Sequence, residues 1–470
     1  MKLSINRKIS ITRQQLLCPE FLFVMIGYLF GLSLVFANPP FHSNDEDRHF
    51  YNSYFLSTGQ IRPVQHENQI GGYLPSNLYN VSATFQGIPF YSGARIFPAK
   101  LKELKSVRLD ESSTMFYDNP SYRTNPVPYL PYAAGILIAR IVNSNPINLL
   151  WGARCAGLLA FLCIVFFAIR IMPVHKFLLF ALALNPMTLY QAASVTYDAM
   201  SVSLSFLLVA LALNYAFQER QIRVGQIVLF LFVAIVHCFA KPGYFLIPFV
   251  FFVIPQRNIG SMKKTVGLFF CLVLIGFLPD LIWGGYVSSL HLNGGKALCK
   301  DFVYGTREQW NSIARAPTSF LVHFLLNFIV QGKEWMIGAM GRLGYSYTHL
   351  NHTVLFFHGL ALIALSGLDS SKALIISLRQ KLILGCVSIG TIGFIAAAFF
   401  YGSPVGAHTI FGLQGRYFIP AMLPILLLNS NPMFRTAIWE KRKTLIVPLY
   451  ASALLGYLVL FTASHFYYLP

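Results

Sequence analysis

The chain has 470 residues, of which 55% are hydrophobic and 11% charged, and its formal net charge is +19. Apolar runs long enough to cross a bilayer recur along it, which excludes a water-soluble protein and indicates a polytopic membrane protein. In such proteins basic residues gather in cytoplasmic loops, so the positive charge does not indicate a nucleic-acid partner.

The first apolar run, residues 19–37, is the first predicted span. Four basic residues precede it: Lys2, Arg7, Lys8 and Arg13. Because basic flanks stay on the cytoplasmic side, we expect a cytoplasmic N-terminus and an outside location for the loop that follows. The run is too long for the apolar core of a signal peptide, so we interpret it as a retained signal anchor.

A polar stretch, residues 39–59, leaves this span with the sequence PPFHSNDEDRHFYNSYFLSTG. It places three acids together: Asp45, Glu46 and Asp47. Ser43-x-x-Glu46 has the form of a capping box, which predicts a helix that starts here and is closed by Gly59. Acids in a first turn face the positive end of the helix, and Asp45 and His49 share one face of it. Taken alone, the stretch also fits an interfacial helix whose acids only satisfy the dipole.

The first outer loop is predicted to cover residues 38–148 and to carry interfacial helices. A polar region this long is usually functional or disordered, and its aromatic content favours order. Its last part, residues 127–142, is apolar but short for a span and contains Pro128 and Pro131. If it crossed the membrane, every later basic cluster would lie outside. We therefore predict that it lies at the interface or re-enters.

The remaining apolar runs predict ten more spans, with spans 2–7 in residues 149–283, a second outer loop in 284–353, and spans 8–11 in 354–463. The second loop contains a possible helix at 319–330. The ten predicted spans are 149–169, 177–193, 199–217, 224–240, 244–254, 265–283, 354–368, 382–401, 417–428 and 445–463. The sequence thus predicts one integral membrane domain over residues 1–470, an all-α bundle of about eleven spans with an outside C-terminus.

Three charged residues fall at the outer ends of these spans. Asp198 starts the fourth span; an acid at a membrane edge needs a partner or a function, although it also fits a partner of the helix dipole. Lys241 ends the fifth span and would either bind an anion or extend to the surface. Arg416, followed by Tyr417, stands at the start of the tenth span. An outer arginine opposes the positive-inside trend, which indicates either an anionic partner or an anchor against lipid headgroups.

Soluble-enzyme signatures are missing from the sequence: it has no Walker A loop, no GxGxxG after a strand, no HExxH and no GxSxG. The seven cysteines form no CxxC pair, so we interpret them as packing residues. His42, Asp45 and His49 are residue types that bind metals, but their spacing is not diagnostic. We therefore predict no cofactor, with a divalent metal at these residues as the alternative.

The stretch NPPFHSNDEDRHFYNSYFLSTG resembles the DE-x-x-HF-x-x-x-Y start of a bacterial membrane protein family of unknown function, DUF2142. The resemblance continues in family order through YLPYAAGILIAR, NPMTLYQAASVTYDAM, AKPGYFLIPFVFFVIP, MGRLGYSYTHL and LQGRYFIPAMLP, and so covers nearly the whole chain. That family is similar to the GT-C glycosyltransferases, multi-span enzymes that take sugars from polyprenyl-phosphate donors and carry a catalytic acid in the first outer loop.

The resemblance implies a GT-C-like fold with Asp45, Glu46 and His49 as catalytic residues, in which Asp45 has the position of the base, Glu46 lies beside it and His49 is the matching histidine. Where the family commonly has a Pro-Ala pair after its two acids, this chain has Asp47-Arg48. Such chemistry needs a base for the acceptor hydroxyl and cations for the departing phosphate. We expect Asp198, Lys241, Arg416 and Tyr417 to bind the donor.

The resulting hypothesis is an inner-membrane glycosyltransferase that works on the outer face. Its expected partners are a lipid-linked sugar donor, membrane lipids and a cell-envelope glycan or lipid acceptor, with no nucleic acid. A flippase or transporter for lipid-linked glycans is the main alternative, and it would favour charged residues in the middle of the spans. The spans look nearly charge-free, which favours the enzyme. A non-catalytic subunit of an envelope assembly is a third interpretation.

Overall fold

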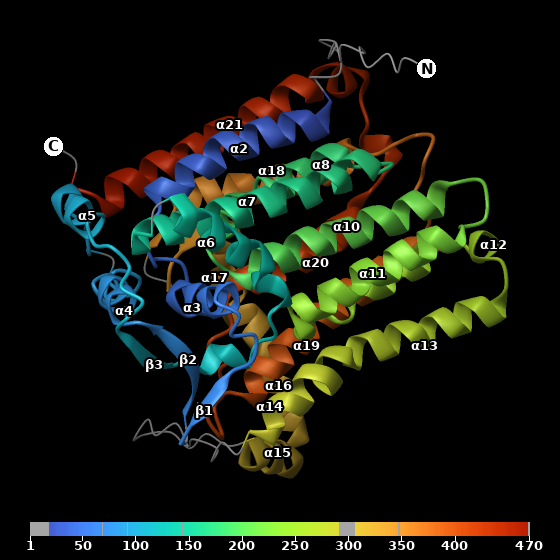
Figure 1. The fold of residues 1–470 in the computed structure, drawn as a ribbon. Coiled ribbons are helices and arrows are strands. Elements are labelled where there is room, and N and C mark those ends of the chain that lie inside the picture. The colour runs from blue at the N-terminus through green and yellow to red at the C-terminus, as the bar shows by residue number, and fades with distance from the viewer. Residues whose placement is uncertain are drawn as a thin grey trace, which may run out of the picture.

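The computed structural model describes residues 18–67, 69–91, 93–142, 144–290, 306–345 and 348–468. Long helices run side by side between two ends of the molecule (Figure 1). One end holds the short helix α3 (Glu46–Ser57) and a small sheet, and we call it the α3 end. The opposite end holds α12 (Gln256–Ile259), and we call it the far end.

Six helices in the described residues are long and apolar enough to cross a membrane, which confirms an all-α, multi-pass membrane fold. They are α2 (Pro19–Ala37), α7 (Pro146–Ile171), α10 (Tyr197–Phe217), α13 (Met262–Pro279) continued through a π-helical turn into α14 (Gly285–Ser289), α19 (Leu378–Tyr401) and α21 (Ala437–Phe466). A seventh span results if α15 (Thr306–Arg315) and α16 (Pro317–Val330), which bend by 104°, count as one.

The other predicted spans are shorter or broken, so the described chain does not contain eleven single helices of spanning length. Two are helices of 17 residues, α11 (Val224–Ala240) and α18 (His352–Leu368). The segments 177–193, 244–254 and 417–428 consist of short pieces because each contains proline, which lacks an N–H donor. These pieces are α8 (Lys176–Ala183), α9 (Pro186–Ala192), η3 (Pro242–Tyr244), η4 (Ile247–Val253), η6 (Gly415–Phe418), α20 (Ile419–Leu426) and η7 (Leu427–Asn429).

The long segment between α2 and α7 contains a three-stranded antiparallel sheet that the sequence did not predict. Its strands are β1 (Val64–His66), β2 (Gln69–Pro75) and β3 (Thr114–Asp118), in the order β1-β2-β3. Gly71 and Gly72 interrupt the alternation of apolar and polar residues that would indicate β2 in the sequence. A Cβ at Gly71 would lie 1.8 Å from the backbone oxygen of Tyr117, so only glycine permits this pairing.

Short helices surround this sheet: α4 (Ser76–Ala83), α5 (Pro98–Leu104), η1 (Pro120–Arg123), η2 (Val127–Tyr129) and α6 (Leu130–Val142). Helix α6 has 13 residues and is therefore about 20 Å long, less than the ~30 Å of a hydrocarbon core. It packs closely on α7, where a Cβ at Gly135 would lie 2.2 Å from the oxygen of Gly152. The helix cannot cross a bilayer alone.

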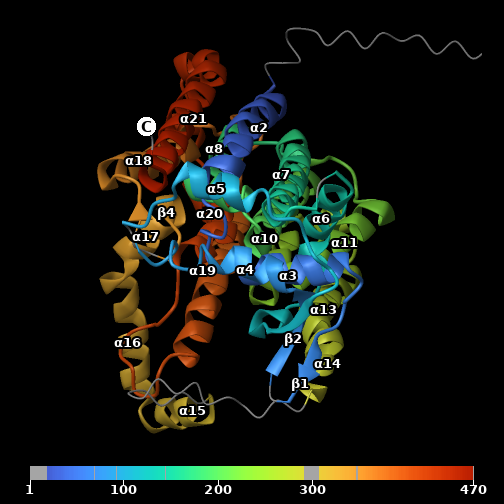
Figure 2. The same cartoon turned by 60° about the vertical axis from the view of Figure 1, so that its left-hand side comes forward.

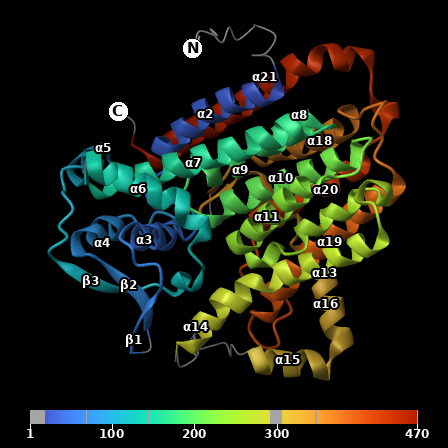
Figure 3. The ribbon, with the colours of Figure 1, turned by 45° about the vertical axis from the view of Figure 1, so that its right-hand side comes forward.

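Segments from distant parts of the chain complete the bundle. The second loop returns through α17 (Gly332–Gly341) and a small hairpin of β4 (Arg342–Leu343) and β5 (Thr348–His349). Helix α16 stands beside α19, with the Phe320 and Phe400 rings 5.0 Å apart (Figure 2). The first and last long helices, α2 and α21, lie alongside each other (Figure 3).

Candidate functional site

The four residues expected to bind a donor come together at the α3 end. Lys241 Nζ lies 2.7 Å from Asp198 Oδ1, and Arg416 Nη1 lies 3.4 Å from Asp198 Oδ2. The Tyr417 ring lies under both cations, with its centroid 4.0 Å from Lys241 Nζ and 5.1 Å from Arg416 Cζ. We call Asp198, Lys241, Arg416 and Tyr417 the cation cluster.

Breaks in helices position this cluster. The Thr196 hydroxyl accepts the N–H of Asp198 at 3.2 Å and so starts α10 at that point. Helix α11 ends at Lys241 because Pro242 follows it. Gly415 lets η6 press against α17, since a Cβ there would lie 1.7 Å from the oxygen of Trp335. The start of α10, the end of α11 and the start of η6, which are far apart in sequence, therefore lie together at the cation cluster.

Arg416 is buried but poorly satisfied. Only 5% of its surface is exposed. Its contacts to Gln191 Oε1 and Tyr417 Oη are long, at 3.4 and 3.3 Å, and its Nε has no partner among the described residues. The cluster pairs one carboxylate with two cations and therefore carries one excess positive charge. Buried charge of this kind is costly unless a counter-ion completes it.

Arg416 also lines a cavity of about 220 Å³, which we call the arginine cavity. A second arginine, Arg342, lines it, and the Nε of this side chain is likewise unpartnered within the described chain. The remaining lining residues are Met187, Trp335, Gly338, Gly344, Gly412, Leu413, Gln414 and Gly415. Arg342 is paired with Glu334, so Arg416 is the guanidinium in this lining that remains available to an anion.

An apolar groove of about 350 Å³ adjoins the arginine cavity, and Trp335 lines both. Its walls come from the helices α16 to α20. The lining residues are Phe328, Gly332, Trp335, Met336, Ala339, Met340, Gly359, Leu362, Ile363, Ile392, Phe418, Met422 and Leu426. Met336 and Ile363 are more than half exposed, so the groove opens on the outer surface of the helices. The arginine cavity and the apolar groove therefore share Trp335 as a wall residue.

Asp45 does not line the arginine cavity, but its neighbours contact residues that do. Its backbone N–H donates to Tyr345 Oη at 2.8 Å, and that hydroxyl donates to Asp45 Oδ1 at 2.7 Å. The neighbouring Asn44 donates to Gln414 Oε1 at 3.1 Å, and Gln414 lines the cavity, as does Gly344 beside Tyr345. The Asp45 side chain is 35% exposed, so its carboxylate is accessible to a substrate.

Helix α3 starts differently from the predicted capping box. Asp45 is the N-cap, in a left-handed conformation with φ 56°, and Ser43 is not. A non-glycine residue in this region stores strain, which is common at functional sites and which Asp tolerates better than most residues. The predicted end at Gly59 is confirmed, with φ +83° and a bond from the Gln60 N–H to the oxygen of Phe55 at 2.8 Å.

His49 lies in α3 between Asp45 and the cation cluster. Its Nδ1 is 2.8 Å from Tyr129 Oη, and its ring is 4.6 Å from that of Tyr197. Burial lowers the pKa of His49 to about 4, although the carboxylates of Asp45 and Asp198 act in the opposite direction. The imidazole is therefore neutral at physiological pH and serves as a hydrogen-bonding group there.

Glu46 has a setting unlike that of its neighbour Asp45. Its two oxygens accept from Arg154 Nε and Nη2 at 2.8 and 2.7 Å, and neither side chain is exposed. Glu46 Oε1 also accepts the N–H of Val195 at 3.0 Å. This geometry makes Glu46 a structural partner and removes it as a free base, contrary to the role expected from its place beside Asp45.

Arg154 was missed in the sequence, where it lies inside an apolar run that looked free of charge. It also donates to the backbone oxygens of Val35, Asn38 and Pro39. An arginine within a span was the signal available, because such residues face a buried partner or a function. The expectation that the spans are nearly charge-free is wrong at this position.

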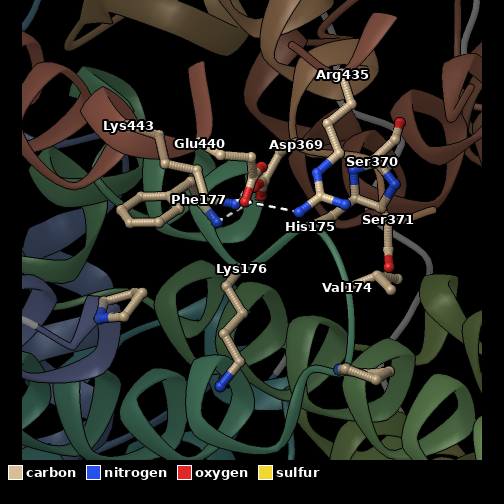
Figure 4. Close-up of a pocket in the computed structure, with 12 residues that line it drawn as sticks. Val174, His175, Lys176, Phe177, Asp369, Ser370, Ser371, Arg435, Glu440 and Lys443 are labelled. Atoms are coloured by element: carbon tan, nitrogen blue, oxygen red, sulfur yellow. Dashed lines mark hydrogen bonds and ion pairs between the residues drawn. The ribbon is translucent and has the colours of Figure 1, made fainter. Parts of the chain in front are cut away.

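A polar cavity of about 200 Å³ at the far end has a different character (Figure 4). Asp369 accepts Lys443 Nζ at 3.1 Å and the backbone N–H of Phe177 at 2.8 Å, which caps α8. Glu440 pairs with Lys443 and with Arg435, each at 3.0 Å. Four of its charged residues, Asp369, Glu440, Lys443 and Arg435, satisfy one another, so we interpret them as a structural contact between α8, α18 and α21.

The predicted metal-binding histidines face hydroxyl groups in the structure. His42 Nδ1 is 2.7 Å from Tyr190 Oη, just as His49 faces Tyr129. Within the described ranges, no group of three or more His, Cys, Asp or Glu residues is arranged to hold a metal ion. The polar groups at the candidate site are therefore cations, hydroxyls and one accessible carboxylate, that of Asp45.

The sequence profile of a family described as "Predicted membrane protein (DUF2142)" matches residues 28–425 of the chain. The match begins within α2 and ends within α20, so it includes α3 and the whole cation cluster. Neither the curated proteins nor the solved structures include a significant match to this chain.

Proposed function

The chain belongs to the DUF2142 family of predicted membrane proteins, and we propose that it is a membrane glycosyltransferase of GT-C type. The proposed donor is a sugar linked to a polyprenyl phosphate, and the acceptor belongs to the cell envelope. The observation that carries this proposal is the buried, poorly satisfied Arg416, whose cavity also contains Gln414, the side chain that Asn44 next to Asp45 contacts.

The charge of the cation cluster supports a phosphate ligand. Asp198 neutralises one of the two cations, Lys241 and Arg416, and a phosphate would neutralise the other. The long contacts of Arg416 leave its N–H groups available for stronger, charge-assisted bonds to phosphate oxygens. A developing phosphate charge would be stabilised by donors already in place.

The apolar groove supports a lipid-linked donor. It meets the arginine cavity at Trp335 and opens on the outer surface of the helices. A phosphate held by Arg416 would leave an attached isoprenoid chain beside this groove. A soluble sugar nucleotide would have no use for an apolar channel at this place.

Asp45 is the proposed base. It would take the proton of an acceptor hydroxyl as the oxygen bonds to the anomeric carbon of the sugar, while the bond from that carbon to the phosphate oxygen breaks. The phosphate would leave with the electron pair toward Arg416 and Lys241. The Tyr345 hydroxyl fixes the orientation of Asp45 through its bond to Oδ1.

The proposed orientation places the α3 end outside and the far end in the cytoplasm of an inner membrane. The basic clusters 170–176, 220–223, 257–264, 372–381 and 435–443 all adjoin the far ends of the long helices. Contacts across this end support that grouping, such as Asn214 to the oxygen of Ile171 at 2.8 Å. Basic residues concentrate on the cytoplasmic side of membrane proteins.

The test is Asp45→Asn, with Glu103→Gln as the control because Glu103 is an exposed acid of the same outer region. Lipid-linked sugars and surface glycans would be compared in cells that carry each variant. We expect Asp45→Asn to reduce transfer about a hundredfold to ten-thousandfold, because a base is lost, and Glu103→Gln to have no effect. Full activity of Asp45→Asn at normal expression would refute the assignment.

A further inference from the structure

A second cavity, of about 280 Å³, lies at the start of α3. Tyr345, which holds the Asp45 carboxylate, lines this second cavity, and so do Ser43, Asp47 and Arg48 from the same stretch of chain. The candidate base is therefore next to the lining residues of two cavities of different chemistry. We call the second one the aromatic cavity.

One wall of the aromatic cavity is a flat aromatic surface. The rings of Phe90 and Tyr345 are stacked, with centroids 4.6 Å apart and planes at 9°. A bond from the Tyr345 N–H to the oxygen of Pro89, at 3.3 Å, holds the two segments together. Phe90 is 50% exposed, so part of its ring is free to contact a ligand. Flat aromatic surfaces pack well against rings that carry both apolar and polar groups.

The rest of the lining offers hydrogen bonds of both kinds. Asp47 supplies acceptor oxygens, Arg48 supplies donors, and Gln86 supplies both. Ser43 is 1% exposed, and its hydroxyl has no partner within the described residues. This hydroxyl is therefore free to bond to a ligand in the cavity.

We propose that the aromatic cavity binds the acceptor and that the acceptor is a carbohydrate. This inference rests on the proposed function and selects the glycan over a lipid acceptor. A sugar ring on Phe90 would present its hydroxyls to Asp47, Arg48 and Ser43, and one of them to Asp45. That hydroxyl loses its proton to Asp45 as its oxygen bonds to the donor sugar, whose bond to phosphate breaks on the side of the arginine cavity.

The contrast between the two cavities supports this assignment of substrates. The apolar groove that meets the arginine cavity suits an isoprenoid chain, whereas charged and amide groups interrupt the aromatic cavity and would be desolvated by an alkyl chain.

The test measures glycan binding by the full-length protein in detergent, with an array of oligosaccharides from bacterial surface polysaccharides as the probe. The variants are Phe90→Ala and Arg48→Ala. The matched control is Phe97→Ala, since Phe97 is also an exposed ring stacked on a tyrosine, Tyr468, but lies outside the cavity. Binding of undecaprenyl phosphate is measured in parallel to report on the donor site.

We expect the wild-type protein to bind a subset of the glycans. Phe90→Ala and Arg48→Ala should each weaken that binding by roughly tenfold, the worth of one aromatic or charged contact, and Phe97→Ala should not. Absence of glycan binding, or binding indifferent to Phe90 and Arg48, would overturn the inference. Neither result would affect the proposed function, which instead fails if the wild-type protein does not bind undecaprenyl phosphate.

Discussion

Replacing Glu46 by Gln separates the structural acid of α3 from the proposed base. Arg154 donates five hydrogen bonds, two to Glu46 and three to backbone oxygens, and all are between 2.7 and 2.9 Å. A Gln side chain keeps the shape but loses the charge, and its amide group turns a donor toward the donors of Arg154. The arginine is then a buried cation without a counter-ion.

The expected cost is about 3–5 kcal/mol, the range for breaking a buried pair by removal of one partner. Asp45→Asn, by contrast, changes a partly exposed side chain and should alter stability by about 0.5 kcal/mol or less. Thermal unfolding of detergent-solubilised protein, followed by fluorescence-detected size exclusion, measures both. The unfolding temperature of Glu46→Gln should lie well below that of the wild type. The unfolding temperature of Asp45→Asn should equal that of the wild type.

The double variant Glu46→Gln/Arg154→Gln provides the decisive control. It removes the uncompensated charge, so it should recover part of the loss, although the oxygens of Val35, Asn38 and Pro39 lose their donors. A Glu46→Gln protein that is as stable as the wild type but inactive would refute this reasoning and return Glu46 to the catalytic group.

Three further predictions follow from the same geometry. Arg416→Lys keeps the charge but cannot form two parallel hydrogen bonds to a phosphate, so affinity for undecaprenyl phosphate should fall roughly tenfold. Unchanged affinity in both Arg416→Lys and Arg416→Gln would exclude Arg416 from the donor site. Burial lowers the pKa of His42 to about 3 and that of His49 to about 4, from 6.5, so protonation favours the unfolded state and thermal stability should decline as the pH falls from 6.5 toward 4. Thermal stability that does not change between pH 6.5 and pH 4 would contradict this prediction. His49→Gln should remove part of the decline in stability. Cysteine labelling of intact cells should reach residues introduced at Ser121 and at Gly294, a position outside the described residues, but not at Gln221 and Ser261. A label at Gln221 would contradict the proposed orientation.

The sequence predicted the positions of helices better than their continuity. Apolar runs and basic flanks locate α7, α10, α19 and α21, because burial in lipid depends on composition along the run. Whether a run forms one helix depends on what replaces the hydrogen bonds lost at proline, and these partners lie elsewhere in the chain. One of them is the Tyr244 hydroxyl, which donates to the oxygen of Tyr417 at 2.9 Å.

The sequence predicted which residues belong to the candidate site, but not which of them contact one another. Asp198, Lys241 and Arg416 were singled out as charges at membrane edges, and they form one cluster. The pairing of Glu46 with Arg154 joins residues 108 positions apart, and no local pattern in the sequence encodes such a distance. The left-handed start of α3 at Asp45 likewise depends on the Tyr345 hydroxyl, 300 positions away.

The buried charges themselves distinguish structure from function in this protein. The Glu46–Arg154 pair is neutral and held by short bonds, and the far-end cavity balances Asp369 and Glu440 against Lys443 and Arg435. The cation cluster alone among these three is unbalanced, with one carboxylate for two cations and contacts of Arg416 no shorter than 3.3 Å. Replacing a buried and uncompensated Arg416 with an apolar residue would stabilise the fold, unless an anion completes the site. The imbalance therefore favours an anionic ligand beside Arg416, which is the role that the proposed lipid phosphate donor would fill.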